Sequence, residues 1–422
     1  MYLGRIYSPL TGGRWLDIPA GAMCVDGDGR IVEIGQASEM RSACQDARIV
    51  DFSGELILPG LVDCHQHLTH YDWTRLIPDL LTWLETIYEL ELRFEDLAYA
   101  QHTSESFFRE LLQHGTTTAC VHGPYFHEAT RIAFSVARRF GNRITMGMNQ
   151  GDLNLPNPLR RAIDDSLMDA VRLHDEWNGV DSGRLRYCFT VRPAYCASRQ
   201  LLVAVAKKAY ELDAWIQGHL SEDAAGVHEI LANFPECGSD TEVYQNLGLL
   251  SRKTIMAHGI YLRPGDTDRL AGSGTGIVHC PRANLLAGGR QADTHAIRAK
   301  GISLALGSDL GAGKNLSMFR VMEDAFKVTP SLDIHTLFRW ATLDGAKLLG
   351  LADEVGSLEP GKGADFIVVH PPWVERNSGF AVSVRIDDLL ASLVFSAGAE
   401  NVRNTFIQGQ LCPAKGDLTL CP

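Results

Sequence analysis

From about residue 57 to residue 350, the sequence alternates between short apolar runs and longer stretches of helical character. Runs such as TTTACV, AWIQGHL and TIMAHGI are typical of β-strands, because they are short, apolar and bounded by turn residues. The stretches between them, such as EDLAYAQHTSESFFRELLQHG and RQLLVAVAKKAYELD, are typical of helices. Strands that alternate with helices form a parallel sheet. About eight such units predict an α/β fold of the (β/α)8, TIM-like barrel type.

Both ends of the chain carry strand patterns instead. AMCVDGDGRIVEIG places a DGDG turn between two apolar runs, as in a β-hairpin. LILPGLVDC has the pattern of one strand that is buried on both faces. GSLEPGKGADFIVVHPPW and VRNTFIQGQLCP, later in the chain, have the pattern of short hairpins. We therefore predict a small β-sandwich domain built from both termini, residues 1–57 plus 352–422, beside a barrel catalytic domain of residues 58–351.

The composition excludes several classes of protein. The chain has 422 residues, a formal net charge of −12 and 45% apolar residues, so it can bury a large core and is not expected to be disordered. The acidic balance disfavours nucleic acid as a partner. A signal-peptide pattern and a membrane-spanning apolar run are both missing, which favours a cytoplasmic protein without a membrane partner. The ten cysteines are scattered without a CxxC pair, which predicts reduced thiols rather than a disulfide scaffold.

The motif PGLVDCHQHLTH gives the strongest local signal of chemistry. His65 and His67 are two residues apart at the end of an apolar strand, so both imidazoles point to the same side. At the carboxyl end of a barrel strand, two such imidazoles can bind one divalent metal ion. Taken alone, the pair is equally consistent with two surface histidines whose hydrogen bonds are satisfied.

Later strands also end in residues that suit metal binding or proton transfer. IQGHLSED, TIMAHGI, TGIVHCP and LALGSDLGAG carry His219, His258, His279 and Asp309, and Glu222 follows His219 by three residues. Singly, Glu222 is explained as a carboxylate in the first turn of a helix, and Asp309 as a helix N-cap. In a barrel, however, all these strand ends converge on one mouth, which is where active sites lie. A third imidazole there would complete a metal set with one open position, with Glu222 as a general acid or base beside it.

These residues and the segments around them resemble the amidohydrolase superfamily, in the aminohydrolase branch with one metal per site. The resemblance covers nearly the whole chain, from PGLVDCHQH through HLSE, MAHG, HCPRANL and GSD to LGLADEVGSLEPGKGADFIVV. Within that branch the chain is most similar to the guanine deaminases. The more specific signatures are GTTTAC, HLSED followed by VYQNLGLL and KTIMAHG, and GSDLGAGKNLSMFRVMEDAFKV with WATLDGAKLLGL.

The resemblance implies a set of roles for individual residues. The metal ligands would be His65, His67, His219 and Asp309, holding one divalent ion, Zn²⁺ or Fe²⁺. Glu222 would be the proton shuttle, and His258 would lie over the catalytic water and the substrate. Arg192, in TVRPAYCAS, would contact the purine, and His279 would lie at the rim of the pocket. A homodimer is the state that the resemblance implies.

Three features depart from the guanine deaminase pattern. His70 stands where that family usually carries a glutamine that reads the purine edge, and Pro193 stands where a phenylalanine stacks on the purine. TIYELELRF replaces the aromatic-proline segment expected after WL. Losing an amide and a stacking ring changes both the hydrogen bonding and the shape of the pocket. We expect Arg192 and His70 to hold the polar edge of the substrate, with Trp83 as a wall.

The predicted function is hydrolytic deamination of an amino-substituted N-heterocycle, guanine or a close guanine-like purine, with release of ammonia. A pterin, 8-oxoguanine or an aminotriazine is the alternative substrate on the same scaffold, and a related triazine hydrolase activity belongs with it. A two-metal cyclic amide hydrolase normally needs a bridging carboxylated lysine, and no lysine occurs in GTTTACVHGPYFH or RITMGMNQGDLN. A non-catalytic barrel would be expected to lack ligands, whereas all four expected ligands and Glu222 are present.

Overall fold

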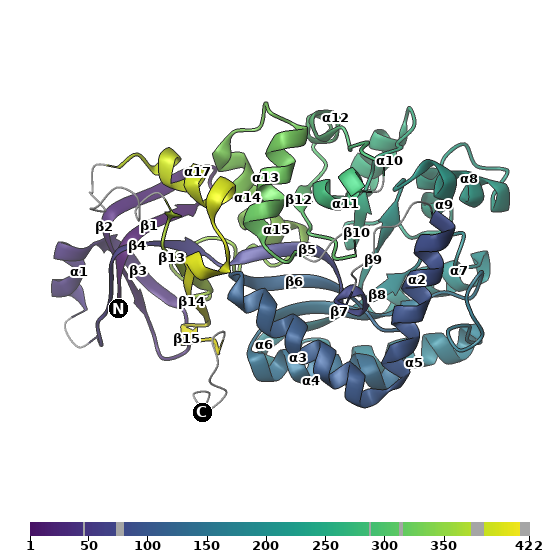
Figure 1. Ribbon diagram of the computed structural model, residues 1–422, viewed down its shortest axis with the longest axis horizontal. Coiled ribbons are helices and arrows are strands. Elements are labelled where there is room, and N and C mark those ends of the chain that lie inside the picture. The colour runs from purple at the N-terminus through teal and green to yellow at the C-terminus, as the bar shows by residue number, and fades with distance from the viewer. Residues whose placement is uncertain (45–46, 73–79, 287, 312–314, 373–383, 414–422) are drawn as a thin grey trace.

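The computed structural model describes residues 1–44, 47–72, 80–286, 288–311, 315–372 and 384–413, and it describes residues 43 and 80–85 by their backbone only. Two bodies lie next to each other along the long axis of the molecule (Figure 1). One is a sheet to which the beginning and the end of the chain both contribute. The other is a larger barrel that is covered by helices.

The larger body is the predicted parallel barrel. Its eight strands pair in sequence order, each parallel to the next. The first and last strands meet at a seam, where the Asp309 amide donates to the His65 carbonyl at 3.0 Å. This confirms the prediction of a (β/α)8, TIM-like barrel. The strands are β5 (Leu61–His67), β6 (Thr116–Gly123), β7 (Arg143–Gln150), β8 (Leu185–Val191), β9 (Trp215–Leu220), β10 (Thr254–His258), β11 (Gly276–His279) and β12 (Leu304–Leu306).

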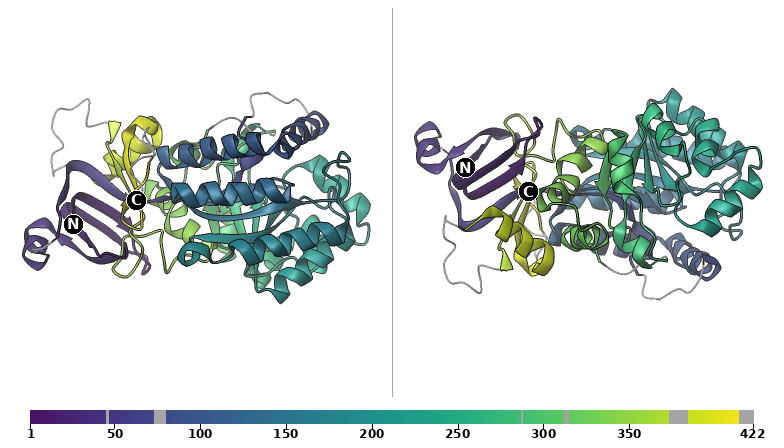
Figure 2. Two further views of the ribbon diagram at one scale, coloured as in Figure 1. Left: turned by 90° about the horizontal axis from the view of Figure 1, so that it is seen from below. Right: turned by 90° about the horizontal axis from the view of Figure 1, so that it is seen from above.

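Helices surround the barrel (Figure 2). In α3 (Leu97–Gln113), the Asp96 side chain caps the first turn by accepting from the Ala98 amide at 2.8 Å. Phe107, Phe108 and Leu111 of the same helix are fully buried, so its apolar stripe supplies the packing that holds it to the sheet. The other helices of this body are α2 (Leu80–Leu92), α4 (His127–Phe140), α5 (Ile163–Trp177), α6 (Val180–Gly183), α7 (Arg199–Glu211), α8 (Ala224–Asn233), α9 (Asp240–Asn246), α10 (Asp266–Ser273), α11 (Pro281–Leu286), α12 (Thr294–Ala299), α13 (Met318–Val328), α14 (Ile334–Trp340) and α15 (Leu343–Leu348), with the short 3-10 turns η1 (Leu68–His70) and η2 (Arg93–Glu95). Within the described ranges, no helix is long and apolar enough to cross a membrane.

The smaller body is the predicted β-domain from both termini, and its strands belong to one seven-stranded sheet in the order β15-β14-β13-β4-β1-β2-β3. β1 and β4 pair in parallel, and the other neighbours are antiparallel. Ile6, Ile57, Phe366, Val368 and Phe406, from both parts of the chain, share its core. The elements are β1 (Tyr2–Pro9), β2 (Trp15–Val25), β3 (Ile31–Gln36), β4 (Val50–Pro59), β13 (Phe366–Val369), β14 (Val402–Ile407) and β15 (Gln410–Leu411), with α1 (Ala37–Ala43), α17 (Ile386–Ser396) and η3 (Ala399–Asn401).

The run LILPGLVDC, which the sequence pattern assigns to one strand, is divided between the two bodies. β4 ends at Pro59 in the terminal sheet, and β5 begins at Leu61 in the barrel. Gly60 lies between them, packed so closely on Thr117 that a Cβ atom would come within 2.1 Å of its side-chain oxygen. The continuous apolar pattern has a physical reason, because both strands are buried, but it hides the point where the chain passes from one sheet to the other.

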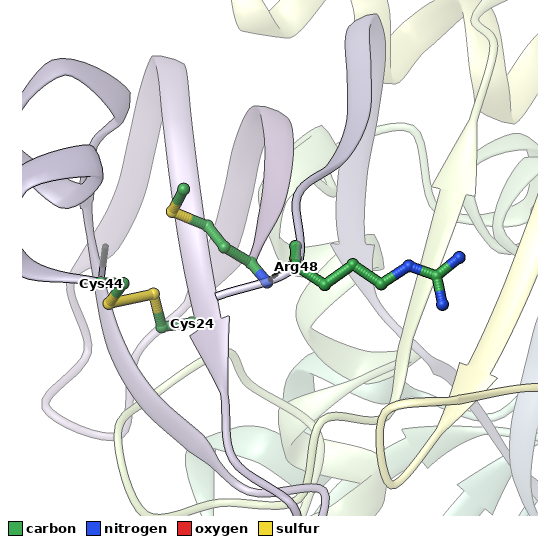
Figure 3. Close-up of a disulfide and its surroundings, with 4 residues drawn as sticks. Cys24, Cys44 and Arg48 are labelled. Atoms are coloured by element: carbon green, nitrogen blue, oxygen red, sulfur yellow. Dashed lines mark hydrogen bonds between the residues drawn. A yellow bond between two sulfur atoms is a disulfide. The ribbon is translucent and has the colours of Figure 1, made fainter. Parts of the chain in front are cut away.

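The cysteines depart from the prediction of reduced thiols. Cys24 of β2 and Cys44, which directly follows α1, form a disulfide (Figure 3). Arg48 lies nearby, and its carbonyl accepts from the Met1 amino group at 2.7 Å. The prediction was wrong for this pair because α1 folds back against β2, a contact that cysteine spacing does not reveal. Six further described cysteines are free and buried: Cys64, Cys120, Cys188, Cys196, Cys237 and Cys280.

Candidate active site

The carboxyl ends of the barrel strands bring together four residues that the sequence places at strand ends. His65 and His67 lie at the end of β5, His219 lies near the end of β9, and Asp309 lies in the loop after β12. His67 Nε2 is 3.1 Å from His219 Nε2. Asp309 Oδ1 is 3.5 Å from Nε2 of both His65 and His67. The four candidate metal ligands therefore form one cluster.

This cluster fits a divalent cation. The three imidazoles are at most 5% exposed. Burial lowers the pKa of each, so they are neutral and their nitrogen lone pairs can bind a metal. Burial alone would raise the pKa of Asp309, but His65 and His258 hold it below its usual value, which keeps the carboxylate ionised. Among the described residues, His65 Nε2 and His219 Nδ1 have no hydrogen-bond partner. Imidazole and carboxylate donors in this number suit Zn²⁺ or Fe²⁺.

Three residues at this mouth have a strained backbone conformation, among them Ser221, which follows β9 and has a φ of 49°. His258, the last residue of β10, has a φ of 77°, and Asp309 has a φ of 49°. For residues other than glycine, this left-handed region costs of order 1 kcal/mol or more. Backbone hydrogen bonds hold the neighbouring turns in place, among them the 2.8 Å bond from the Gly259 amide to the Leu220 carbonyl. The strain occurs where the candidate catalytic residues leave their strands, as is frequent at active sites.

Glu222 and His258 lie beside the cluster as a candidate proton-transfer pair. His258 Nε2 is 3.7 Å from Glu222 Oε1 and 3.7 Å from Asp309 Oδ2. Burial raises the pKa of the Glu222 carboxyl, so this group can hold a proton closer to neutral pH. The pKa of His258 is raised as well, because Glu222 and Asp309 outweigh its burial. Asn284 of α11, which the sequence did not single out, accepts from His258 Nδ1 at 3.0 Å and orients the ring.

The predicted substrate-contacting residues lie around this pair. Arg192 directly follows β8 and is 1% exposed, and its Nε and Nη1 have no hydrogen-bond partner among the described residues. Pro193, His219 and Glu222 line an open pocket whose empty space, solvent included, is about 220 Å³. His70 stacks on His67, with ring centroids 4.3 Å apart.

Two further predicted residues give less information about the pocket. His279 ends β11, is fully buried, and has no hydrogen-bond partner at either ring nitrogen among the described residues. Trp83 lies on α2, but its side chain is outside the part of the chain that the structure describes.

A buried carboxylate at the barrel seam supports the ligands, and the sequence reading did not identify it. Asp63 of β5 is fully buried and accepts from the Ser308 amide at 3.0 Å, from Gln66 Nε2 at 2.8 Å and from the Ser308 hydroxyl. The Gln66 side chain in turn accepts from the Leu310 amide at 3.3 Å. These bonds connect the segment of His65 and His67 with the segment of Asp309. Asp63 therefore fixes the two halves of the candidate metal site relative to each other.

The substitution Asp63→Asn is expected to lower the free energy of unfolding by about 2 kcal/mol, because one acceptor oxygen becomes an NH₂ group that faces other donors in a buried site. Denaturant-induced unfolding of the metal-free protein measures this. Asp51→Asn is the matched control, since Asp51 is exposed and accepts from the Ser53 amide in a turn; its effect should stay within about 0.5 kcal/mol. Equal effects of the two substitutions would show that Asp63 does not support the seam.

Known proteins resemble this chain in sequence and in fold. Residues 56–412 match the model of the amidohydrolase family. Guanine deaminase of Escherichia coli (strain K12) is 31% identical over 375 residues, which cover 86% of this chain and 84% of that protein. Guanine deaminase of Homo sapiens is 29% identical over 82% of this chain and 81% of that protein. The solved structure of the E. coli guanine deaminase superimposes with a TM-score of 0.93 and 28% identity, over 98% of this chain and 99% of the other.

Proposed function

The chain belongs to the amidohydrolase family, and we propose that it is a metal-dependent hydrolytic deaminase whose substrate is guanine or a close guanine-like purine. The observation that carries this proposal is the placement of Glu222 and His258 beside the cluster of His65, His67, His219 and Asp309. The similarity to guanine deaminases over more than four fifths of the chain supports the substrate class. Zn²⁺ is the metal that we expect, because it suits imidazole and carboxylate ligands with one open position.

The residues of the chain account for the proton transfers of such a reaction. A bound divalent cation supplies a water with a lowered pKa and polarises the reacting centre. Asp309 Oδ2 and His258 Nε2, 3.7 Å apart, orient the attacking water and take up its proton. Glu222 gives a proton to the ring nitrogen next to the attacked carbon and then helps transfer a proton to the leaving amine. Water replaces the amino group, so the products are a ring carbonyl and ammonia.

The substrate would be held by two buried polar side chains close to the ligand cluster, Arg192 and His70. Arg192 can only donate hydrogen bonds, so its buried guanidinium suits a carbonyl oxygen or an unprotonated ring nitrogen of a purine. His70 Nδ1 donates to the Leu310 carbonyl at 3.0 Å, which makes Nε2 an acceptor in the neutral ring. Burial lowers the pKa of His70 to about 3, so the ring stays neutral. Together, Arg192 and His70 recognise an edge that carries both acceptors and an N–H donor.

His70, in the position where guanine deaminases usually carry a glutamine, is the reason to test the alternative substrates as well. A glutamine amide both donates and accepts, whereas neutral His70 in this tautomer only accepts at Nε2. A site with such a change can favour a ring whose donor lies elsewhere, as in a pterin, 8-oxoguanine or an aminotriazine. The site contains all four candidate ligands and the acid, which does not favour a non-catalytic barrel. β6 and β7 contain no lysine. A two-metal cyclic amide hydrolase would need a bridging carboxylated lysine there.

The test is a screen for ammonia release by the zinc-loaded protein from guanine, 8-oxoguanine, pterins and aminotriazines. We expect guanine to give the highest kcat/KM, by about tenfold or more over the other rings, since the guanine-like edge matches the donors and acceptors of the site. Hypoxanthine, which has no exocyclic amine, is the control and should release no ammonia. Preference for a pterin or a triazine would contradict guanine as the substrate. No ammonia from any of these rings, with the metal bound, would contradict the deaminase proposal itself.

A further inference from the structure

His122 is a further histidine at the same mouth of the barrel, and it takes no part in the proposed proton transfers. His122 is near the end of β6, and its register partner on the neighbouring strand β5 is His67. Its ring centroid is 4.5 Å from that of His67 and 4.8 Å from that of His219. The side chain is fully buried. His122 therefore borders directly on two of the candidate metal ligands.

The hydrogen bonds behind His122 determine which of its nitrogens carries the proton. Glu91 of α2 is fully buried, and its Oε1 accepts from the Thr69 hydroxyl at 2.8 Å and from Asn149 Nδ2 at 3.1 Å. The amide oxygen of Asn149 then faces His122 and accepts from its Nδ1 at 3.2 Å. A neutral imidazole that donates from Nδ1 has its lone pair on Nε2. These contacts leave Nε2 unprotonated, on the side of the ring that faces away from Asn149.

The His122 ring lies among other side chains that can bind a metal. The ligand atoms of His67, His122 and His219 all lie within 4.8 Å of one another. Among the described residues, His122 Nε2 has no hydrogen-bond partner. Buried acceptor nitrogens that converge without a donor are unfavourable, because each loses its hydrogen bonds to water. A shared cation removes that cost. A histidine whose other nitrogen is held by an amide or a carboxylate is also the usual arrangement of a metal ligand.

We propose that His122 Nε2 is a further direct ligand of the catalytic cation, and that Asn149 and Glu91 hold the ring in the binding tautomer. The proposal rests on the metal centre of the proposed function but not on its substrate. It gives the centre four imidazole donors and one carboxylate, one more protein donor than the set His65, His67, His219 and Asp309. Such a centre accepts a cation with five or six ligands, which broadens the choice of metal beyond a strictly tetrahedral site.

Two substitutions of His122 separate a ligand from a structural side chain. In His122→Asn, the amide NH₂ takes the place of Nδ1–H and keeps the bond to Asn149, but no atom remains at the Nε2 position. In His122→Gln, the amide reaches the Nε2 position and offers an oxygen there. His279→Asn is the matched control, because His279 is also a fully buried histidine at a strand end but belongs to none of the groups of potential ligands among the described residues.

The experiment measures metal binding to the full-length, metal-free protein and uses no substrate. Zn²⁺ affinity is obtained by competition with a chromophoric chelator, and the coordination of Co²⁺ is followed by its visible absorption. We expect His122→Asn to weaken Zn²⁺ binding by about 10- to 100-fold and to change the Co²⁺ spectrum, with His122→Gln between it and the unsubstituted protein. His279→Asn should leave both unchanged. Unchanged binding in His122→Asn, or an equal loss in His279→Asn, would overturn the proposal.

A measurement on the unsubstituted protein covers the case in which His122→Asn does not fold. In Co²⁺-loaded protein, each ligating imidazole contributes one paramagnetically shifted proton from its other ring nitrogen to the NMR spectrum in H₂O. A contact-shifted N–H signal assigned to the His122 ring supports His122 as a ligand, and the absence of such a shift from His122 overturns the proposal. Neither result depends on ammonia release, so a failure of the proposed deaminase function would be seen separately in the substrate screen.

Discussion

Replacement of Glu222 by glutamine is expected to lower the turnover number by about 10³-fold or more while the metal content stays unchanged. Glutamine has nearly the same size and keeps an oxygen near His258, but it cannot give a proton to the ring nitrogen or to the leaving amine. Glu222 Oε1 is 3.7 Å from His258 Nε2 and lies next to the ligand cluster without belonging to it. Its raised pKa is suited to an acid that works near neutral pH.

The neighbouring carboxylate provides the control for Glu222→Gln. Asp223 caps α8 by accepting from the Gly226 amide at 2.8 Å, and asparagine is an equally good N-cap. Asp223→Asn should therefore lower turnover by less than about tenfold and leave the thermal midpoint almost unchanged. Turnover is measured as ammonia release at saturating substrate, and metal content by elemental analysis. If Glu222→Gln retains a substantial part of the turnover, or loses its metal, Glu222 is not the proton shuttle.

The barrel and most of its candidate site could be predicted, because the sequence patterns that indicate them are local. Each strand is a short apolar run, and its last residues face the mouth, so strand-end histidines and Asp309 could be placed before any contact was known. The same criterion also applies to TTTACVHG, where His122 ends a strand as His65 and His258 do. His122 is not among the predicted ligands because the family signature in this segment, GTTTAC, ends at Cys120.

The supporting residues could not be found in this way, because their partners are far apart in the chain. Asn284 meets His258, Asn149 meets Glu91, and Asp63 meets Ser308 across 245 residues. Each of these is a common polar residue whose local sequence gives no sign of its partner. The Cys24–Cys44 disulfide was missed for the same reason, since only the return of α1 against β2 brings the two residues together.

Removal of the metal by a strong chelator is expected to lower ammonia release by about 10³-fold or more and to lower the thermal midpoint by several degrees. The loss of activity follows because the metal lowers the pKa of the attacking water toward neutrality. The loss of stability follows because a ligand at about 1,000 times its Kd stabilises the folded state by about 4 kcal/mol. Without a cation, His67 Nε2 and His219 Nε2 also lie 3.1 Å apart as two buried neutral nitrogens that lack a shared positive charge.

Adding metals back to the chelated protein distinguishes this explanation from damage by the chelator. Zn²⁺, or Fe²⁺ without oxygen, should restore both the ammonia release and the thermal midpoint, whereas Mg²⁺ should restore neither, because Mg²⁺ prefers oxygen ligands and this cluster is mainly imidazole. Recovery of the midpoint without recovery of activity would mean that the cation is structural. Undiminished activity in protein that holds less than about a tenth of an equivalent of metal would contradict metal-dependent chemistry at this site.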